Sequence, residues 1–99
     1  MVKLTVLYGQ PKSPAEFEKY YAETHTPLAC KMDVRKVELA KVLRTPDGST
    51  PAFYRTADIY FDDMAHLQRS TSAPEGQAAI GDLKNFATGG VTVLISEVA

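Results

Sequence analysis

The sequence predicts one α+β domain over residues 1–99, in which helices cover one side of a four-stranded antiparallel sheet. Apolar and polar residues alternate in short segments near the start, middle and end of the chain, which is the period of strands. Two intervening segments begin with a serine followed closely by proline and glutamate, a pattern typical of helix starts. Ninety-nine residues are also enough for one hydrophobic core.

The chain is expected to begin with a strand over residues 2–8, where β-branched and aromatic residues precede a glycine and a proline. A helix follows this strand. Ser13 can cap it, Pro14 suits its first position, and Glu16 completes a capping box by reaching back to the Ser13 amide. The first strand therefore leads into a helix with a well-defined start.

One face of this helix is expected to pack against the sheet. At about 100° per residue, that face contains Phe17, Tyr21, Thr24 and Leu28, with Tyr20 beside it. Thr26 precedes Pro27 and is biased away from helical backbone, so the helix should weaken near His25. A histidine is therefore expected at the helix end, on the edge of the apolar arc.

Two further strands are expected in the middle of the chain, over residues 37–44 and 52–61. The segment between them, TPDGSTP, is a turn whose strongest signal is its Asp-Gly pair. Strict alternation divides the second of these strands into two faces. One face holds Phe53, Arg55, Ala57, Ile59 and Phe61, and the other holds Tyr54, Thr56, Asp58 and Tyr60.

The last third of the chain predicts two helical regions and a final strand. Asp62 and Asp63 favour a helix start for residues 64–70. The stretch SAPE starts another helix that runs to about Phe86. Two glycines then end this helix, and residues 91–98 form the last strand. The resulting β-α-β-β-α-β order is that of a ferredoxin-like fold.

Both faces of the first and last strands carry apolar side chains, although one layer of helices covers only one face. Val6 opposes Leu7 in the first strand, and Val93 opposes Leu94 in the last. We therefore expect a homodimer in which a second copy packs its sheet face to face with the first. The alternative is a monomer whose last strand is short and central.

The composition excludes several classes of partner. Eleven Lys and Arg against twelve Asp and Glu give a net charge of −1, and the basic residues are scattered, so nothing favours nucleic acid or an anionic membrane. No apolar run approaches the roughly 20 residues of a membrane span, and the N-terminus lacks signal-peptide features. The single cysteine, Cys30, fits a reducing compartment, so the expected location is the cytoplasm.

His25 and the aromatic residues near it are the candidates for chemistry. A histidine at a helix C-terminus can move protons near neutral pH, or it can simply cap carbonyl groups. Tyr20 and Tyr21 can line a pocket or fill the core. Three more polar residues share one strand face: Tyr54, Asp58 and Tyr60. They would join the histidine if that face meets the first helix, and would be interface or edge groups otherwise.

No metal or nucleotide motif is present. His66 lies near two aspartates, but there is no HExxH, no CxxC and no histidine pair one turn apart, which favours a solvated helix start. Cys30 has no histidine fixed beside it in sequence and is interpreted as structural or incidental. The sequence has no GxGxxG and no P-loop, which argues against nucleotide cofactors, and we expect no bound cofactor.

Two stretches resemble the motifs of a known protein family. FEKYYAETHTPL, residues 17–28, resembles F-x-x-Y-Y-x-x-x-H-x-P-L, and APEGQAAIGDLKNF, residues 73–86, resembles S-P-E-G-Q-x-A-x-x-D-x-x-N-F. Both patterns resemble signatures of the EthD family of small bacterial proteins. The visible departure is Ala73 in place of serine, for which Ser72 can substitute as the cap.

The resemblance implies a ferredoxin-like protomer whose sheet joins that of a second copy in a dimeric α+β barrel. It also implies a small-molecule pocket between each sheet and its helices. The expected ligand is a small, apolar organic compound of a degradation or secondary-metabolism pathway. The expected activity is that of a cofactor-independent enzyme, either oxidoreductase or monooxygenase-like or isomerase or cyclase-like.

Within this expectation His25 transfers a proton and Tyr21 orients the ligand, which makes them the predicted catalytic residues. The predicted ligand-binding residues are Phe17, Tyr20, Leu28, Tyr54, Asp58 and Tyr60. One alternative is a non-catalytic accessory module that serves a partner oxygenase. Another is a haem-binding relative that uses His25 or His66 as its axial ligand.

Overall fold

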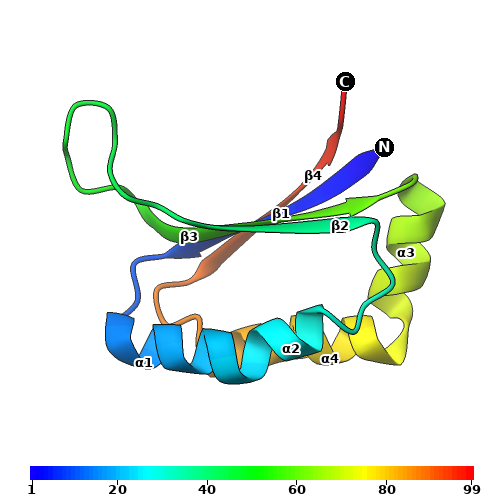
Figure 1. The fold of residues 1–99 in the computed structure, drawn as a ribbon, viewed down its shortest axis with the longest axis horizontal. Coiled ribbons are helices and arrows are strands. Elements are labelled where there is room, and N and C mark those ends of the chain that lie inside the picture. The colour runs from blue at the N-terminus through cyan, green and yellow to red at the C-terminus, as the bar shows by residue number, and fades with distance from the viewer.

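The computed structural model describes all residues, 1–99, as a sheet with helices on one side (Figure 1). In chain order the elements are β1 (Val2–Gly9), α1 (Pro14–Tyr20), a π-helical turn (Tyr21–His25), α2 (Thr26–Ala29), β2 (Lys36–Lys41), β3 (Phe53–Phe61), α3 (Met64–Ser72), α4 (Pro74–Asp82), a 3₁₀ turn (Leu83–Asn85) and β4 (Val91–Glu97). The predicted α+β class and the order of strands and helices are therefore confirmed.

The four strands form one antiparallel sheet in the order β2-β3-β1-β4, so β2 and β4 are its edges. The α1–α2 segment and α4 lie on the same side of the sheet, α3 closes one end, and the β2–β3 loop extends beyond the other end (Figure 1). The second sheet face carries no helix. None of the helices combines the length and apolar character that crossing a membrane requires.

The hydrophobic core lies between the helices and the two central strands. Leu4 pairs with Ile59 and Val6 pairs with Ala57, so alternate residues of β1 and β3 point into the same layer. The buried helical and inter-element residues that meet them are Phe17, Tyr21, Met32, Leu67, Ala79 and Phe86. This layer of aromatic and aliphatic side chains determines where a ligand cavity can form.

The first helix changes type near His25 and then continues to Ala29, rather than ending. Thr26 has helical backbone angles, φ −57° and ψ −43°, and its amide donates to the Tyr21 carbonyl five residues earlier. The expectation that Thr26 leaves the helical region is therefore wrong. Pro27 lacks an N–H group and its ring crowds the preceding turn, and a single wide π turn accommodates both. The change of pitch leaves Thr24 exposed and His25 buried.

The predicted helices of the last third also differ in detail from the structure. Asp63 caps α3, and its side chain accepts a hydrogen bond from the His66 amide at 2.8 Å. The helix runs on through Ser72, so the prediction that Ser72 caps the next helix is wrong. Ala73 joins α3 to α4 without a side-chain cap. The two helices meet at a sharp corner, which a glycine makes possible.

Gly76→Ala is expected to destabilise the fold by about 1–3 kcal/mol, as overpacking of a tight site does. A Cβ at Gly76 would lie 2.1 Å from the Ser70 carbonyl oxygen, a backbone atom that cannot move aside without shifting α3. Gly81→Ala in the same helix is the matched control, because a Cβ there meets nothing within 4 Å. This control should gain up to about 1 kcal/mol from helix propensity. Urea denaturation measures both, and a shift in the same direction for the two variants contradicts the packing argument.

Candidate functional site

An apolar cavity of about 140 Å³ lies between the helices and the sheet. Its floor includes the cross-strand row Leu39–Ala57–Val6–Val93, in which Ala57 is the smallest side chain. Side chains from α2, α4 and the segments that follow them complete the wall: Ala29, Cys30, Met32, Ala79, Ile80 and Leu83. Fifteen of the 18 lining residues are hydrophobic and none is an acid, lysine or arginine, so a bound molecule would contact mainly hydrocarbon.

Among the polar side chains that line this cavity, His25 is the one best suited to proton transfer. The residue is 6% exposed, and its Nδ1 lies 3.0 Å from Oδ2 of Asp82. A carboxylate only accepts hydrogen bonds, so Nδ1 carries the proton and Nε2 keeps its lone pair. Nε2 lies 3.4 Å from the hydroxyl oxygen of Tyr8, which also lines the cavity. The unprotonated nitrogen therefore lies beside the Tyr8 hydroxyl, and both residues line the apolar cavity.

Asp82, at the end of α4, holds this histidine from behind. The residue is 7% exposed, and its Oδ1 accepts hydrogen bonds from the Tyr20 hydroxyl at 2.6 Å and from Asn85 Nδ2 at 2.9 Å. Burial raises the pKa of Asp82, but the hydrogen bonds from Tyr20, Asn85 and His25 outweigh it and the net pKa is lowered. Asp82 is thus a buried, fully bonded carboxylate at neutral pH.

Burial lowers the pKa of His25 below its usual value, and the hydrogen bond and charge of Asp82 oppose that shift only in part. The imidazole is therefore neutral at pH 7 and able to accept a proton at Nε2. Asp82 would stabilise the imidazolium that results, because the two groups already share a hydrogen bond. An oriented, neutral histidine backed by a carboxylate is the arrangement of a general base.

Aromatic rings surround the histidine and fix its orientation. The Phe86 ring centroid lies 4.6 Å from that of His25, and the Tyr21 ring stacks on it at 5.8 Å. The Arg55 guanidinium lies over the Tyr21 ring, 5.1 Å from its centroid, and forms an ion pair with Glu18. Burial raises the pKa of both Tyr8 and Tyr21. The Tyr8 hydroxyl therefore keeps its proton, which it can donate to an oxygen atom in the cavity.

The structure brings some of the sequence-predicted residues to this cavity and leaves others away from it. Tyr21 and His25 line it. Tyr20 reaches the site through Asp82, whereas Phe17 and Leu28 pack in or against the core and do not line the cavity.

Tyr54 reaches the helix side because the β1–β3 register shifts at Tyr8 and Gly9. Its ring packs on Phe17 and its hydroxyl donates to Glu18. Tyr54 therefore supports α1 and does not line the cavity.

Asp58 and Tyr60 lie on the sheet face without helices. Asp58 pairs with Thr5 in register, and its side chain accepts a hydrogen bond from the Thr5 hydroxyl at 2.6 Å. Tyr60 donates to Glu38 on the neighbouring strand β2. Of the two placements that alternation left open for these residues, the structure has the one away from the cavity, on the face expected to meet a second copy.

Sequence reasoning missed Tyr8 and Asp82. Tyr8 was hidden among the apolar residues of β1, although it shares their alternation with Leu4 and Val6. Asp82 occupies the aspartate position of the second motif, and Asn85 occupies its asparagine position. The second motif therefore supplies the carboxylate that orients the histidine of the first motif, a contact across 57 residues.

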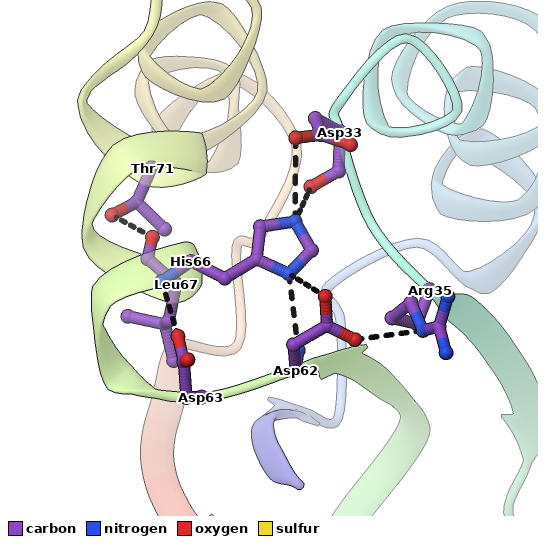
Figure 2. Close-up of polar contacts among 7 residues, drawn as sticks. All are labelled: Asp33, Arg35, Asp62, Asp63, His66, Leu67 and Thr71. Atoms are coloured by element: carbon purple, nitrogen blue, oxygen red, sulfur yellow. Dashed lines mark hydrogen bonds and ion pairs between the residues drawn. The ribbon is translucent and has the colours of Figure 1, made fainter.

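His66 belongs to a separate polar cluster that joins α3 to the segment before β2 (Figure 2). Its Nδ1 accepts from the Asp62 amide at 3.0 Å, and its Nε2 contacts the Asp33 carbonyl oxygen at 3.1 Å. The residue is 5% exposed, so the expectation of a solvated helix start is wrong for its side chain. Both nitrogens are used within the fold, and no group of three or more His, Cys, Asp or Glu side chains could hold a metal ion.

Distant solved structures share the fold. A dimeric protein of unknown function with a ferredoxin-like fold from Bacteroides fragilis NCTC 9343 matches with a TM-score of 0.68 and 19% identity, over 98% of this chain and 95% of that chain. SnoaB, a cofactor-independent oxygenase from Streptomyces nogalater, matches with a TM-score of 0.64 and 18% identity, over 98% and 91%. These similarities confirm the predicted ferredoxin-like fold.

Closer matches identify the family. An uncharacterized 11.0 kDa protein from the thcB-thcC intergenic region of Rhodococcus erythropolis is 36% identical over 97 residues, 98% of this chain and 94% of that protein. The crystal structure of an EthD family protein from Bacillus halodurans C-125 matches with a TM-score of 0.95 and 34% identity, over 100% of this chain and 99% of that chain. The EthD domain model itself matches residues 9–90. The chain therefore belongs to the EthD family.

Proposed function

We propose that the protein is a cofactor-independent enzyme that moves a proton on a small, largely apolar organic molecule. The observation that carries the proposal is the Asp82–His25–Tyr8 arrangement at one end of the apolar cavity. Abstraction of a proton next to a carbonyl group would give an enolate. That enolate could be reprotonated elsewhere, as in an isomerase. It could instead supply electrons to molecular oxygen, so that the CH₂ carbon is oxidised to C=O with one oxygen atom while the other leaves as water, as in a monooxygenase.

The two sides of the site have complementary tasks in such a reaction. His25 Nε2 takes the proton from carbon, and Asp82 stabilises the imidazolium that forms. The Tyr8 hydroxyl donates a hydrogen bond to the oxygen that becomes negative. In an isomerisation His25 then returns the proton to a different carbon, so the base is regenerated and no cofactor is consumed.

A turnover assay with the purified protein alone tests this proposal. Cyclohex-3-enone is a suitable probe, because moving one proton from C2 to C4 gives the conjugated cyclohex-2-enone, which is followed by ultraviolet absorbance. Acceleration over buffer and over heat-unfolded protein supports a catalyst. Binding of ring ketones without isomerisation and without hydrogen exchange in D₂O contradicts it, and favours an accessory module that hands its ligand to a partner oxygenase.

We also propose that the protein works as a homodimer. On the sheet face without helices, Leu94 of β4 is 50% exposed and pairs with Thr5 of β1. Leu7 lies on the same face. Exposed aliphatic residues on an uncovered sheet face are typical of an interface. The dimeric Bacteroides fragilis neighbour is consistent with such an assembly.

Leu94→Asp is expected to convert the dimer to a monomer, since two copies of a charged side chain would be buried across the two-fold axis. Size-exclusion chromatography with light scattering measures the change in mass at a given protein concentration. Met64→Asp is the control, because Met64 is similarly exposed, at 43%, but lies in the first turn of α3 on the helical side. A Leu94→Asp protein that remains dimeric would remove this face from the interface.

A further inference from the structure

The size of the cavity limits the ring that it can enclose. An apolar cavity of about 150 Å³ accommodates one benzene molecule, and the cavity here measures about 140 Å³. Its space exists because Ala57 occupies the centre of the floor row, between Val6 and Leu39. The cavity opens to the surface beside the exposed side chains of Leu39, Ile80 and Val93, so its volume limits the inserted part of a ligand to about one six-membered ring.

The charged groups in and behind the cavity wall also limit the charge that a ligand can carry. The lining residues include no lysine or arginine that could pair with an anion. The Asp82 carboxylate lies directly behind His25, with Oδ2 at 3.0 Å from Nδ1, and would repel a second carboxylate at the polar end. Burial of an unpaired charge in such a space is costly. The ligand is therefore neutral when it enters.

The hydrogen-bonding groups at the polar end match one hydroxyl group. Nε2 of His25 accepts a hydrogen bond and the Tyr8 hydroxyl can donate one. The distance of 3.4 Å between these two atoms is long for a hydrogen bond. A ligand oxygen that contacts both groups would therefore replace one long hydrogen bond with two of normal length. A ligand oxygen that donates to Nε2 and accepts from Tyr8 satisfies both.

We propose that the cavity binds simple phenols, that is, one benzene-sized ring with a single neutral, weakly acidic hydroxyl group. This inference rests on the proposed function, because a phenol is the stable enol of a ring ketone. It has the planar ring and the oxygen position of the enol that His25 would generate. A phenol is then a substrate, a product or a mimic of the intermediate at the same site.

A titration with three one-ring compounds tests the proposal. Phenol, toluene and benzoate are added to ¹⁵N-labelled protein, and amide shifts are followed by NMR. We expect phenol to bind saturably, with shifts centred on residues that line the cavity, and toluene to bind roughly fivefold to tenfold more weakly for want of one hydrogen bond. Benzoate should not saturate. Equal binding of phenol and toluene, or tighter binding of benzoate, overturns the proposal.

Two variants locate the binding. Ala29→Leu adds bulk to the cavity wall and should abolish phenol binding, whereas Ala78→Leu, on the exposed side of α4, should leave it unchanged. His25→Phe keeps a ring at this position but removes the acceptor for the phenol hydroxyl, so it should bind phenol and toluene with similar affinity. If Ala29→Leu does not fold, the mapped shifts and the comparison of phenol with toluene in His25→Phe still decide whether phenol binds at this site. Phenol binding without catalysis by the wild type contradicts the enzyme proposal alone, and ketone turnover without phenol binding contradicts the phenol proposal alone.

Discussion

His25→Gln is expected to reduce the rate of cyclohex-3-enone isomerisation by about 10²–10⁴-fold, the usual contribution of a positioned general base. Glutamine can still donate a hydrogen bond to Asp82, so the variant keeps the buried carboxylate paired. The variant has no basic nitrogen near the Tyr8 hydroxyl, so the proton removed from the substrate carbon has no acceptor. The ultraviolet assay that follows the conjugated product measures the loss.

The second histidine provides the control. His66 is as buried as His25, but its Nε2 contacts the Asp33 carbonyl oxygen in the segment before β2, and its Nδ1 accepts from the Asp62 amide just before α3 (Figure 2). His66→Gln should therefore lower the free energy of unfolding by about 1–3 kcal/mol while the folded fraction keeps its rate. Parallel loss of stability and rate in His25→Gln would mean that His25 has a structural role only.

Asp82→Asn is expected to lower the same rate by about 10²-fold or more and to move its pH dependence. An amide can donate as well as accept, so it no longer fixes the proton on Nδ1, and it stabilises the imidazolium less than a carboxylate does. Activity requires neutral His25, so the rate rises as pH increases through the pKa of this residue. Asp82 raises that pKa against the effect of burial, so its removal lowers the pKa further.

The acidic limb of the pH–rate profile should therefore lie at a lower pH in Asp82→Asn than in the wild type. Tyr20→Phe removes one hydrogen bond to the carboxylate and leaves its charge in place, so it serves as the matched control with a smaller loss of rate. Profiles of kcat/KM from pH 4 to pH 9 measure the limb in all three proteins. If the acidic limb of Asp82→Asn lies at the same pH as in the wild type, or at a higher pH, the assignment of His25 as the base is contradicted.

The sequence was sufficient for the order of the elements because their signals are local. The Ser13 hydroxyl accepts a hydrogen bond from the Glu16 amide as expected. Strand alternation placed Ala57, Ile59 and Phe61 on one face of β3, and the structure shows that this face is the buried one. The continuation of the first helix past Pro27 was not predictable from the preference of Thr26, because a π turn relieves a clash that an α-helical turn cannot.

The site was only half predictable for a different physical reason. Alternation says which residues share a strand face, but not which face the helices cover, so it could not separate Asp58 from the cavity. The partner of His25 comes from the other end of the chain, and only packing of α4 beside α2 brings Asp82 within 3.0 Å. Long-range contacts of this kind leave no local signal in one sequence.

The central claim is that His25 is a neutral, Nδ1-protonated base facing the cavity, and ¹⁵N NMR of its ring tests this directly. At pH 7 we expect the Nδ1 resonance of a protonated nitrogen and the Nε2 resonance of an unprotonated one, with a titration below the usual histidine pKa. Added phenol should shift the Nε2 resonance most. A ring that is protonated on both nitrogens at pH 7, or that carries its single proton on Nε2, would contradict the account.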